Sequence, residues 1–168
     1  DEFVPLRDAT VGPEDPPGCL ADGPTSADAP RLALTYACNN GCVACPAARM
    51  APNRQALAVA CERVTRAVRE GLPAVTLGGG EPTLAAHLAS VLVHCNSSGI
   101  RAILVSNARR LAYPAYLAEL AAAPPALLRT AFFGATELTH DAVTRVPGSF
   151  RQTLRGIRNA RHAGWPVA

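Results

Sequence analysis

The sequence predicts an α/β fold, a partial (βα) barrel of about four β/α units and the start of a fifth strand, with a parallel sheet covered by helices. From residue 31 onward, short apolar runs alternate with longer stretches whose apolar residues recur at helical spacing. Strict alternation of this kind is typical of parallel strands joined by right-handed helical crossovers. The 168 residues suffice for one such domain.

The predicted elements follow one another in strict order. The expected strands are residues 31–36, 74–77, 102–105 and 127–133, and residues 165–168 open a fifth. The expected helices are residues 53–70, 83–95, 113–122 and 150–163. Open α/β sheets and barrels place their chemistry at the carboxyl ends of the strands, so the residues that follow each strand are the candidates for a site.

Apolar stripes predict which helix faces are buried. In the first helix the predicted stripe is Leu57, Cys61, Val64 and Val68. In the second helix it is Leu84, Leu88, Val91, Leu92 and Cys95. Cys61 and Cys95 are therefore interpreted as small core residues rather than as ligands.

Charge and proline are concentrated unevenly along the chain. Residues 1–30 hold seven of the 13 acidic residues and six of the 15 prolines, which predicts a Pro/Gly-rich acidic N-terminal extension. Residues 31–168 hold 15 arginines and six acidic residues, a net charge of +9. We interpret most of these arginines, among them Arg151, Arg155, Arg158 and Arg161, as a solvated helix face.

Composition also excludes several classes of protein. No apolar run is long enough to span a bilayer, and the first residues do not form a signal peptide, so we expect a cytoplasmic protein. No aromatic residues are interleaved with the arginines, which argues against a nucleic-acid partner.

Three cysteines lie within eight residues after the first strand, spaced C-x3-C-x2-C at Cys38, Cys42 and Cys45. Thiolates suit iron–sulfur clusters and zinc. Three of them can hold three corners of a cubane, which leaves the fourth iron free, whereas a structural zinc site needs a fourth ligand. Cys19 is the one spare candidate for that ligand. We favour the open iron–sulfur site and keep zinc as the alternative.

A glycine-rich run follows the second strand and ends in Gly79, Gly80 and Glu81. Glycine lets the backbone approach a ligand closely, and the start of the next helix directs its amides toward the same space. We therefore expect a Cβ at Gly80 to crowd a bound ligand. Because the run lies one strand after the cysteines, the two motifs together indicate a binding site more strongly than the glycines do alone.

These two motifs together resemble the signature of the radical S-adenosylmethionine (SAM) superfamily. The cysteines match its C-x3-C-x2-C loop, and residues 79–82 match its GGE motif after the second strand. The similarity continues through His140-Asp141, Arg145 and residues 147–157, a stretch that looks like members that mature peptides or build cofactors. It covers residues 31–168, which we expect to be the radical SAM-like partial barrel.

The resemblance implies cofactors and chemistry. Cys38, Cys42 and Cys45 would hold a [4Fe–4S] cluster whose open iron chelates the amino and carboxylate groups of SAM. Reductive cleavage of SAM would give methionine and a 5′-deoxyadenosyl radical that abstracts a hydrogen from the substrate. The substrate would be a peptide or a small molecule such as a cofactor precursor, and an external donor would supply the electron.

The resemblance also implies further contacts to SAM. The backbone at Gly79 and Gly80, together with Glu81, would hold the methionine amino group. Ser106 and Asn107, which end the third strand, would approach the ribose or the carboxylate.

Several positions depart from the family's pattern or have a simpler interpretation. Ala44 stands where the family usually has an aromatic residue, and Ala131 where strand four often carries a serine. His140-Asp141 could orient a substrate or cap the following helix, and we favour capping.

Two expectations follow from the length of the chain. The family's core domain has six β/α units, so residues 31–168 would form a C-terminally incomplete barrel. We expect it to self-associate through its open edge or to need a partner chain. The alternative is a non-catalytic iron–sulfur or zinc-binding α/β module or fragment.

Overall fold

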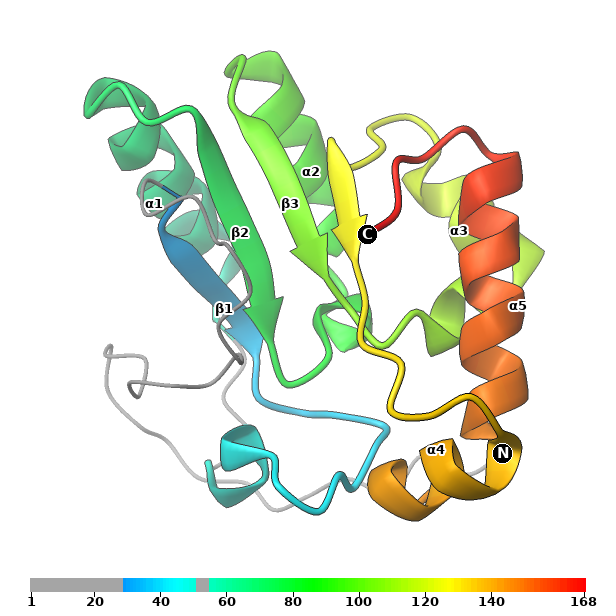
Figure 1. The fold of residues 1–168 in the computed structure, drawn as a ribbon. Helices are drawn as coiled ribbons and strands as arrows, with labels where there is room; N and C mark the ends of the chain where they lie inside the picture. Colours follow the sequence, from blue (N-terminus) through cyan, green and yellow to red (C-terminus); the bar gives the residue numbers. More distant parts are fainter. Residues whose placement is uncertain (1–28, 51–54) are drawn as a thin grey trace.

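The computed structural model describes residues 29–50 and 55–168 and has one parallel sheet, with strand order β1-β2-β3-β4 (Figure 1). The strands are β1 Arg31–Thr35, β2 Ala74–Gly79, β3 Arg101–Val105 and β4 Leu127–Arg129. Neighbours in the sheet are also neighbours in sequence, as expected for β/α units with short crossovers. The predicted α/β fold and parallel sheet are confirmed.

The two edge strands of the sheet, β1 and β4, have pairings that matter for the site and for the barrel. The register between β1 and β2 shifts between Ala33 and Thr35, so that Thr35 lies opposite Gly79 at the end of β2. At the other side Val167 forms a parallel bridge with Leu128 of β4. The amide of Ala168 donates to the carbonyl oxygen of Leu128 at 2.9 Å. The predicted start of a fifth strand is therefore present.

Five α-helices accompany the strands in the described residues. They are α1 Leu57–Arg69, α2 Leu88–Ser97, α3 Pro114–Leu120, α4 Glu137–Thr144 and α5 Ser149–His162. In Figure 1, α1 and α2 lie behind the sheet, α3 and α5 lie to its right, and α4 lies near the arrowheads of the strands. None of these helices is long and apolar enough to cross a membrane.

The core lies between the sheet and the helices behind it. Each strand contributes one fully buried leucine: Leu34, Leu77, Leu104 and Leu128. Burial alternates along β3, as the period of two requires, whereas five successive residues of β2 are buried. The stripe predicted for α2 is buried at Leu88, Val91, Leu92 and Cys95, whereas Leu84 precedes the helix and is half-buried.

The stripe predicted for α1 is confirmed only at Val64, because Cys61, interpreted from the sequence as a core residue, is only half-buried. Leu57 and Val68 are 40% and 37% exposed, and the buried residues are Ala60, Val64 and Ala67. Small alanine side chains let this helix approach the strands closely. The larger apolar residues lie at the margins of the contact.

Several predicted boundaries also needed correction. The second helix begins at Leu88, because Pro82–Leu84 forms a 3-10 turn capped by the side chain of Glu81. Strand β4 ends at Arg129, whose carbonyl oxygen accepts the amide of Ser106, and beyond it the chain turns toward α4. Helix α4 was not predicted. It begins with a capping box formed by Thr136 and Thr139.

Candidate functional site

The three clustered cysteines lie on one loop that leaves β1 and crosses the carboxyl ends of the strands (Figure 1). We call residues 38–45 the cysteine loop. The amides of Gly41 and Val43 donate to the carbonyl oxygens of Thr144 and Val143, at 2.8 and 3.0 Å. The middle of the loop is thus fixed to the end of α4, the helix that the sequence did not predict.

The thiols lie in surroundings that disfavour a bare thiolate. Burial, and then the carboxylate of Glu81 and the neighbouring thiols, raise the pKa of Cys38 to about 12, although the amide of Asn40 donates to its Sγ at 3.4 Å. Burial and Cys45 likewise raise the pKa of Cys42. A thiolate forms in such a place when a cation is bound to it. The loop therefore fits a group that brings positive charge, as the irons of a cluster do.

The three thiols form a loose group. Within residues 29–50 and 55–168, no three His, Cys, Asp or Glu side chains are arranged to hold one metal ion. A cubane binds each thiolate to a different iron, so its ligands are neighbours without converging on one point. Cys38, Cys42 and Cys45 act on one another electrostatically and so lie near each other. Cys19, considered above as a fourth zinc ligand, lies outside the described residues.

The glycine run packs against the backbone that leads into the cysteine loop. The amide of Gly80 donates to the carbonyl oxygen of Thr35 at 2.8 Å. A Cβ at Gly80 would lie 2.5 Å from the carbonyl oxygens of Tyr36 and Ala37. Gly79 has φ +121°, a conformation that side chains rarely adopt. A Cβ at Gly80 would thus collide with the chain's own backbone at this turn.

The Glu81 carboxylate joins the ends of β2 and β3. It is fully buried. Its Oε1 accepts hydrogen bonds from the amide and hydroxyl of Thr83, at 3.0 and 2.6 Å, and from Ser106 Oγ at 2.7 Å. Its Oε2 accepts the amide of Asn107 at 2.8 Å. Burial raises the pKa of the Glu81 carboxyl, and these hydrogen bonds oppose the rise. Glu81 and Ser106, both predicted to contact SAM, are bonded to each other.

Two side chains connect the end of β3 to the cysteine loop. Asn107 Nδ2 donates to Asn39 Oδ1 at 2.7 Å. Arg109 Nη1 donates to the carbonyl oxygen of Asn39 and, at 2.9 Å, to Asn40 Oδ1. Arg109 Nε donates to Gln152 Oε1 on α5 at 2.7 Å. The residues predicted at the ends of three strands are thus brought into one network.

Arg109 was missed because the arginines were interpreted as solvated residues. It is only 9% exposed. It follows Ala108, which has a left-handed backbone with φ 60°. Gly156 of α5 packs directly on the Ala108 carbonyl, where a Cβ would collide with it. The one sequence signal was position, since Arg109 directly follows the polar residues that end the third strand.

Two buried polar atoms beyond β4 have no hydrogen-bond partner in the described structure, Thr130 Oγ1 and His140 Nε2. His140 Nδ1 accepts the amide of Phe133 at 3.2 Å, which places the proton on Nε2. Burial lowers the pKa of His140, so its neutral form is favoured. Thr130 is the residue before Ala131, and it offers a hydroxyl close to where the family often has a serine.

Asp141 caps a helix, as favoured from the sequence. Its carboxylate accepts the amides of Gly148 and Phe150, at 2.6 and 2.8 Å, and Ser149 Oγ at 2.7 Å, all at the start of α5. These hydrogen bonds lower the pKa of Asp141. His140, by contrast, lies inside α4 and caps nothing.

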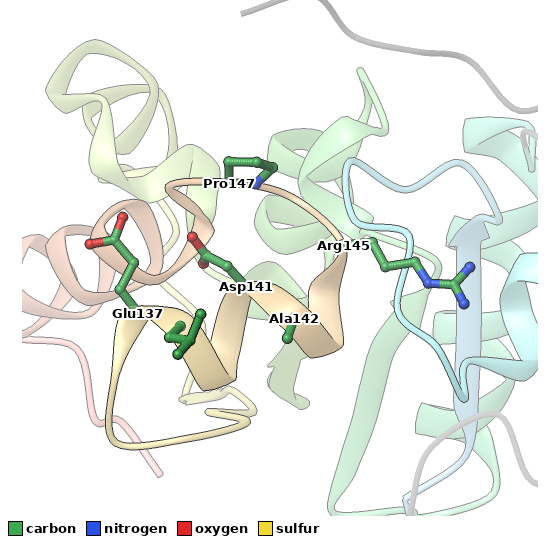
Figure 2. Close-up of a pocket in the computed structure, with 6 residues that line it drawn as sticks. Glu137, Asp141, Ala142, Arg145 and Pro147 are labelled. Atoms are coloured by element: carbon green, nitrogen blue, oxygen red, sulfur yellow. The ribbon is translucent and has the colours of Figure 1, made fainter.

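A hollow of about 590 Å³ borders α4. Its lining residues are Glu137, Leu138, Asp141, Ala142, Arg145 and Pro147. Figure 2 shows Arg145 directed away from the other lining residues. None of the cysteines lines the hollow, but Arg145, which does, lies close to Gly41 of the cysteine loop.

Comparisons with known proteins agree with this arrangement. Residues 32–168 match the family model of the radical SAM superfamily. The chain is 32% identical over 150 residues to the AdoMet-dependent heme synthase of Methanosarcina barkeri, which covers 83% of this chain and 41% of the relative. It is 28% identical over 137 residues to the mycofactocin maturase of Mycolicibacterium smegmatis, covering 80% of this chain and 34% of the relative. The chain thus spans about two fifths of the length of these curated relatives or less.

Solved structures share the fold. SuiB of Streptococcus suis, bound to S-adenosylmethionine, aligns with a TM-score of 0.68 and 20% identity, over 83% of this chain and 32% of that chain. The enzyme anSMEcpe, bound to AdoMet and a peptide, aligns with a TM-score of 0.66 and 16% identity, over 83% of this chain and 42% of that chain. With most of its described residues matched to one family model, the chain belongs to the radical SAM superfamily, whose members bind a [4Fe–4S] cluster and SAM.

Proposed function

We propose that Cys38, Cys42 and Cys45 hold a [4Fe–4S] cluster beside bound SAM, and that the protein cleaves SAM reductively to modify a substrate. The observation that carries this proposal is the cysteine loop itself. Its three thiols lie on one segment fixed at the carboxyl ends of the strands. Three thiolates leave one iron of a cubane without a protein ligand, and the donor set therefore fits a cluster that also binds SAM. The bound cluster would supply the electron for cleavage.

The residues around the loop would position SAM. We assign the methionine amino group to the backbone at Gly79 and Gly80, which end β2 beside the loop. The Glu81 carboxylate is saturated by internal hydrogen bonds, so its role would be to keep the backbone in shape. Thr130 Oγ1, buried and unpartnered after β4, would bond the ribose or carboxylate. In this proposal the hydrogen-bonded Glu81 holds the site in shape, whereas the unpartnered hydroxyl of Thr130 contacts SAM.

We further propose that the substrate is a peptide. The mycofactocin maturase relative and the peptide-bound anSMEcpe structure support this class. The net charge of +9 on residues 31–168 would favour acidic peptides. A tetrapyrrole is the second candidate, because the AdoMet-dependent heme synthase of Methanosarcina barkeri is 32% identical to the chain. A reducing cytoplasm would keep the cysteine ligands from forming disulfides. An external electron donor would reduce the cluster.

The ligand assignment predicts a clear division among the cysteines. After anaerobic reconstitution, the chain should hold about four irons and four sulfides. Cys38→Ala, Cys42→Ala and Cys45→Ala should each lose most of the iron, because each removes one corner of the cluster. Iron and sulfide analysis checks this, with Cys61→Ala and Cys95→Ala as controls that keep the metal. Iron loss from Cys19→Ala as large as from Cys42→Ala would contradict a site of three thiolates.

The contacts of Gly80 predict an effect on the cluster as well as on SAM. In Gly80→Ala the new Cβ would push on the carbonyl oxygens of Tyr36 and Ala37, which lead into the cysteine loop. The variant should therefore retain less iron than wild type and bind SAM more weakly by calorimetry. Gly99→Ala is the control, because a Cβ there meets nothing within 4 Å, although the positive φ of Gly99 adds a backbone strain that Gly80 does not have. Full iron retention in Gly80→Ala would mean that the loop does not depend on this contact.

The substrate class can be tested by binding. Fluorescently labelled acidic peptides should bind the reconstituted protein more tightly than basic peptides of equal length, and added salt should weaken binding. The visible absorption spectrum of an added haem-type tetrapyrrole should stay unchanged when the protein is present, because the tetrapyrrole should not bind. A shifted tetrapyrrole spectrum without peptide binding would reverse the choice between the two substrates, and it would leave the cluster assignment intact.

A further inference from the structure

We propose that Arg109 is a positioning residue of the cluster site, whose guanidinium holds the cysteine loop and whose charge raises the reduction potential of the cluster. The second half of this inference, the effect on the reduction potential, rests on the proposed function. Its first half, the clamp on the loop, concerns the metal-free chain and stands independently.

The hydrogen bonds of Arg109 bind the part of the loop between the first two cysteines. Nη1 donates to the carbonyl oxygen of Asn39 and to Asn40 Oδ1, while Nε donates to Gln152 on α5. One rigid guanidinium fork thus connects the end of β3, the cysteine loop and α5. Asn39 and Asn40 directly follow Cys38, so a shift of this fork would move the first ligand.

The charge of Arg109 is not cancelled at close range. Its side-chain hydrogen bonds within the described part of the chain go to amide or carbonyl oxygens, and there it forms no ion pair with a carboxylate. Burial lowers the pKa of Arg109, whereas Cys38, Tyr113, Glu81 and Asp141 raise it. An arginine stays protonated under these conditions. A fixed positive charge therefore acts on Cys38 from a buried position.

A positive charge beside a cluster favours the reduced form, because reduction adds an electron. The Glu81 carboxylate is also near Cys38, and its negative charge would lower the reduction potential of the cluster. Arg109 would offset that carboxylate. A merely structural arginine would hold the loop without affecting the potential, and two substitutions separate these roles.

Arg109→Gln removes the charge and keeps a hydrogen-bond donor, whereas Arg109→Lys keeps the charge and loses the fork. We expect Arg109→Gln to lower the midpoint potential in a redox titration followed by electron paramagnetic resonance (EPR). At a fixed potential its ratio of reduced to oxidised cluster should fall about tenfold, which is about 59 mV for a one-electron couple. Arg109→Lys should stay close to wild type. Arg155→Gln, an equal charge change on the exposed face of α5, is the control. Equal potentials in Arg109→Gln and Arg155→Gln would overturn the charge role.

The clamp is tested in the metal-free chain by amide hydrogen exchange at Gly41 and Val43, which are bonded to α4. Arg109→Met should speed exchange there by about tenfold or more, while Arg155→Met should not. Unchanged exchange would overturn the clamp. If wild type bound no cluster, the proposed function and the charge role would both fail, and the exchange result would still decide the clamp.

Discussion

The buried carboxylate of Glu81 is the constraint on which the site depends. It accepts hydrogen bonds from Thr83, Ser106 and Asn107 and so fixes the ends of β2 and β3 relative to each other. Burying a carboxylate is costly unless its oxygens are satisfied, and removing one partner from a buried hydrogen bond costs about 1–3 kcal/mol. The two strand ends therefore have one stable arrangement. Asn107 and Arg109, which contact the cysteine loop from the end of β3, are built on that arrangement.

The cysteine loop inherits its position from contacts that are mostly made by backbone. Gly80 bonds to the end of β1, Gly41 and Val43 bond to α4, and Arg109 reaches Asn39 from the end of β3. Each contact uses a planar, rigid group, either a peptide amide or a guanidinium. A site held in this way is preorganised, so bound cofactors need not order it. Charges of opposite sign lie near Cys38, since Glu81 raises the pKa of Cys38 and Cys38 in turn raises the pKa of Arg109.

Local pattern was enough to predict the order of the four strands and of four of the five described α-helices, the parallel sheet and the start of a fifth strand. Cysteine spacing was likewise enough to nominate the loop, since its residues are close in sequence. The sequence could not reveal that Glu81 and Ser106 bond to each other, because they are 25 residues apart. Arg109 and Asn39, 70 residues apart, were missed for the same reason. Helix α4 was missed because it is only eight residues long and has buried polar residues, His140 and Thr144, instead of an apolar stripe.

The most direct test of this account is the EPR spectrum of the reduced cluster, recorded with and without SAM, in wild type and in Glu81→Gln. In Glu81→Gln, an NH2 group would replace one carboxylate oxygen and would face the N–H and O–H donors of Thr83, Ser106 or Asn107. The ends of β2 and β3 should therefore be held less tightly. Wild type should show a spectral change on addition of SAM, because SAM binds the open iron. Glu81→Gln should keep the cluster but need about ten times more SAM, or more, for the same change, while the exposed Glu119→Gln should behave as wild type. A response of Glu81→Gln to SAM equal to that of wild type would contradict the account.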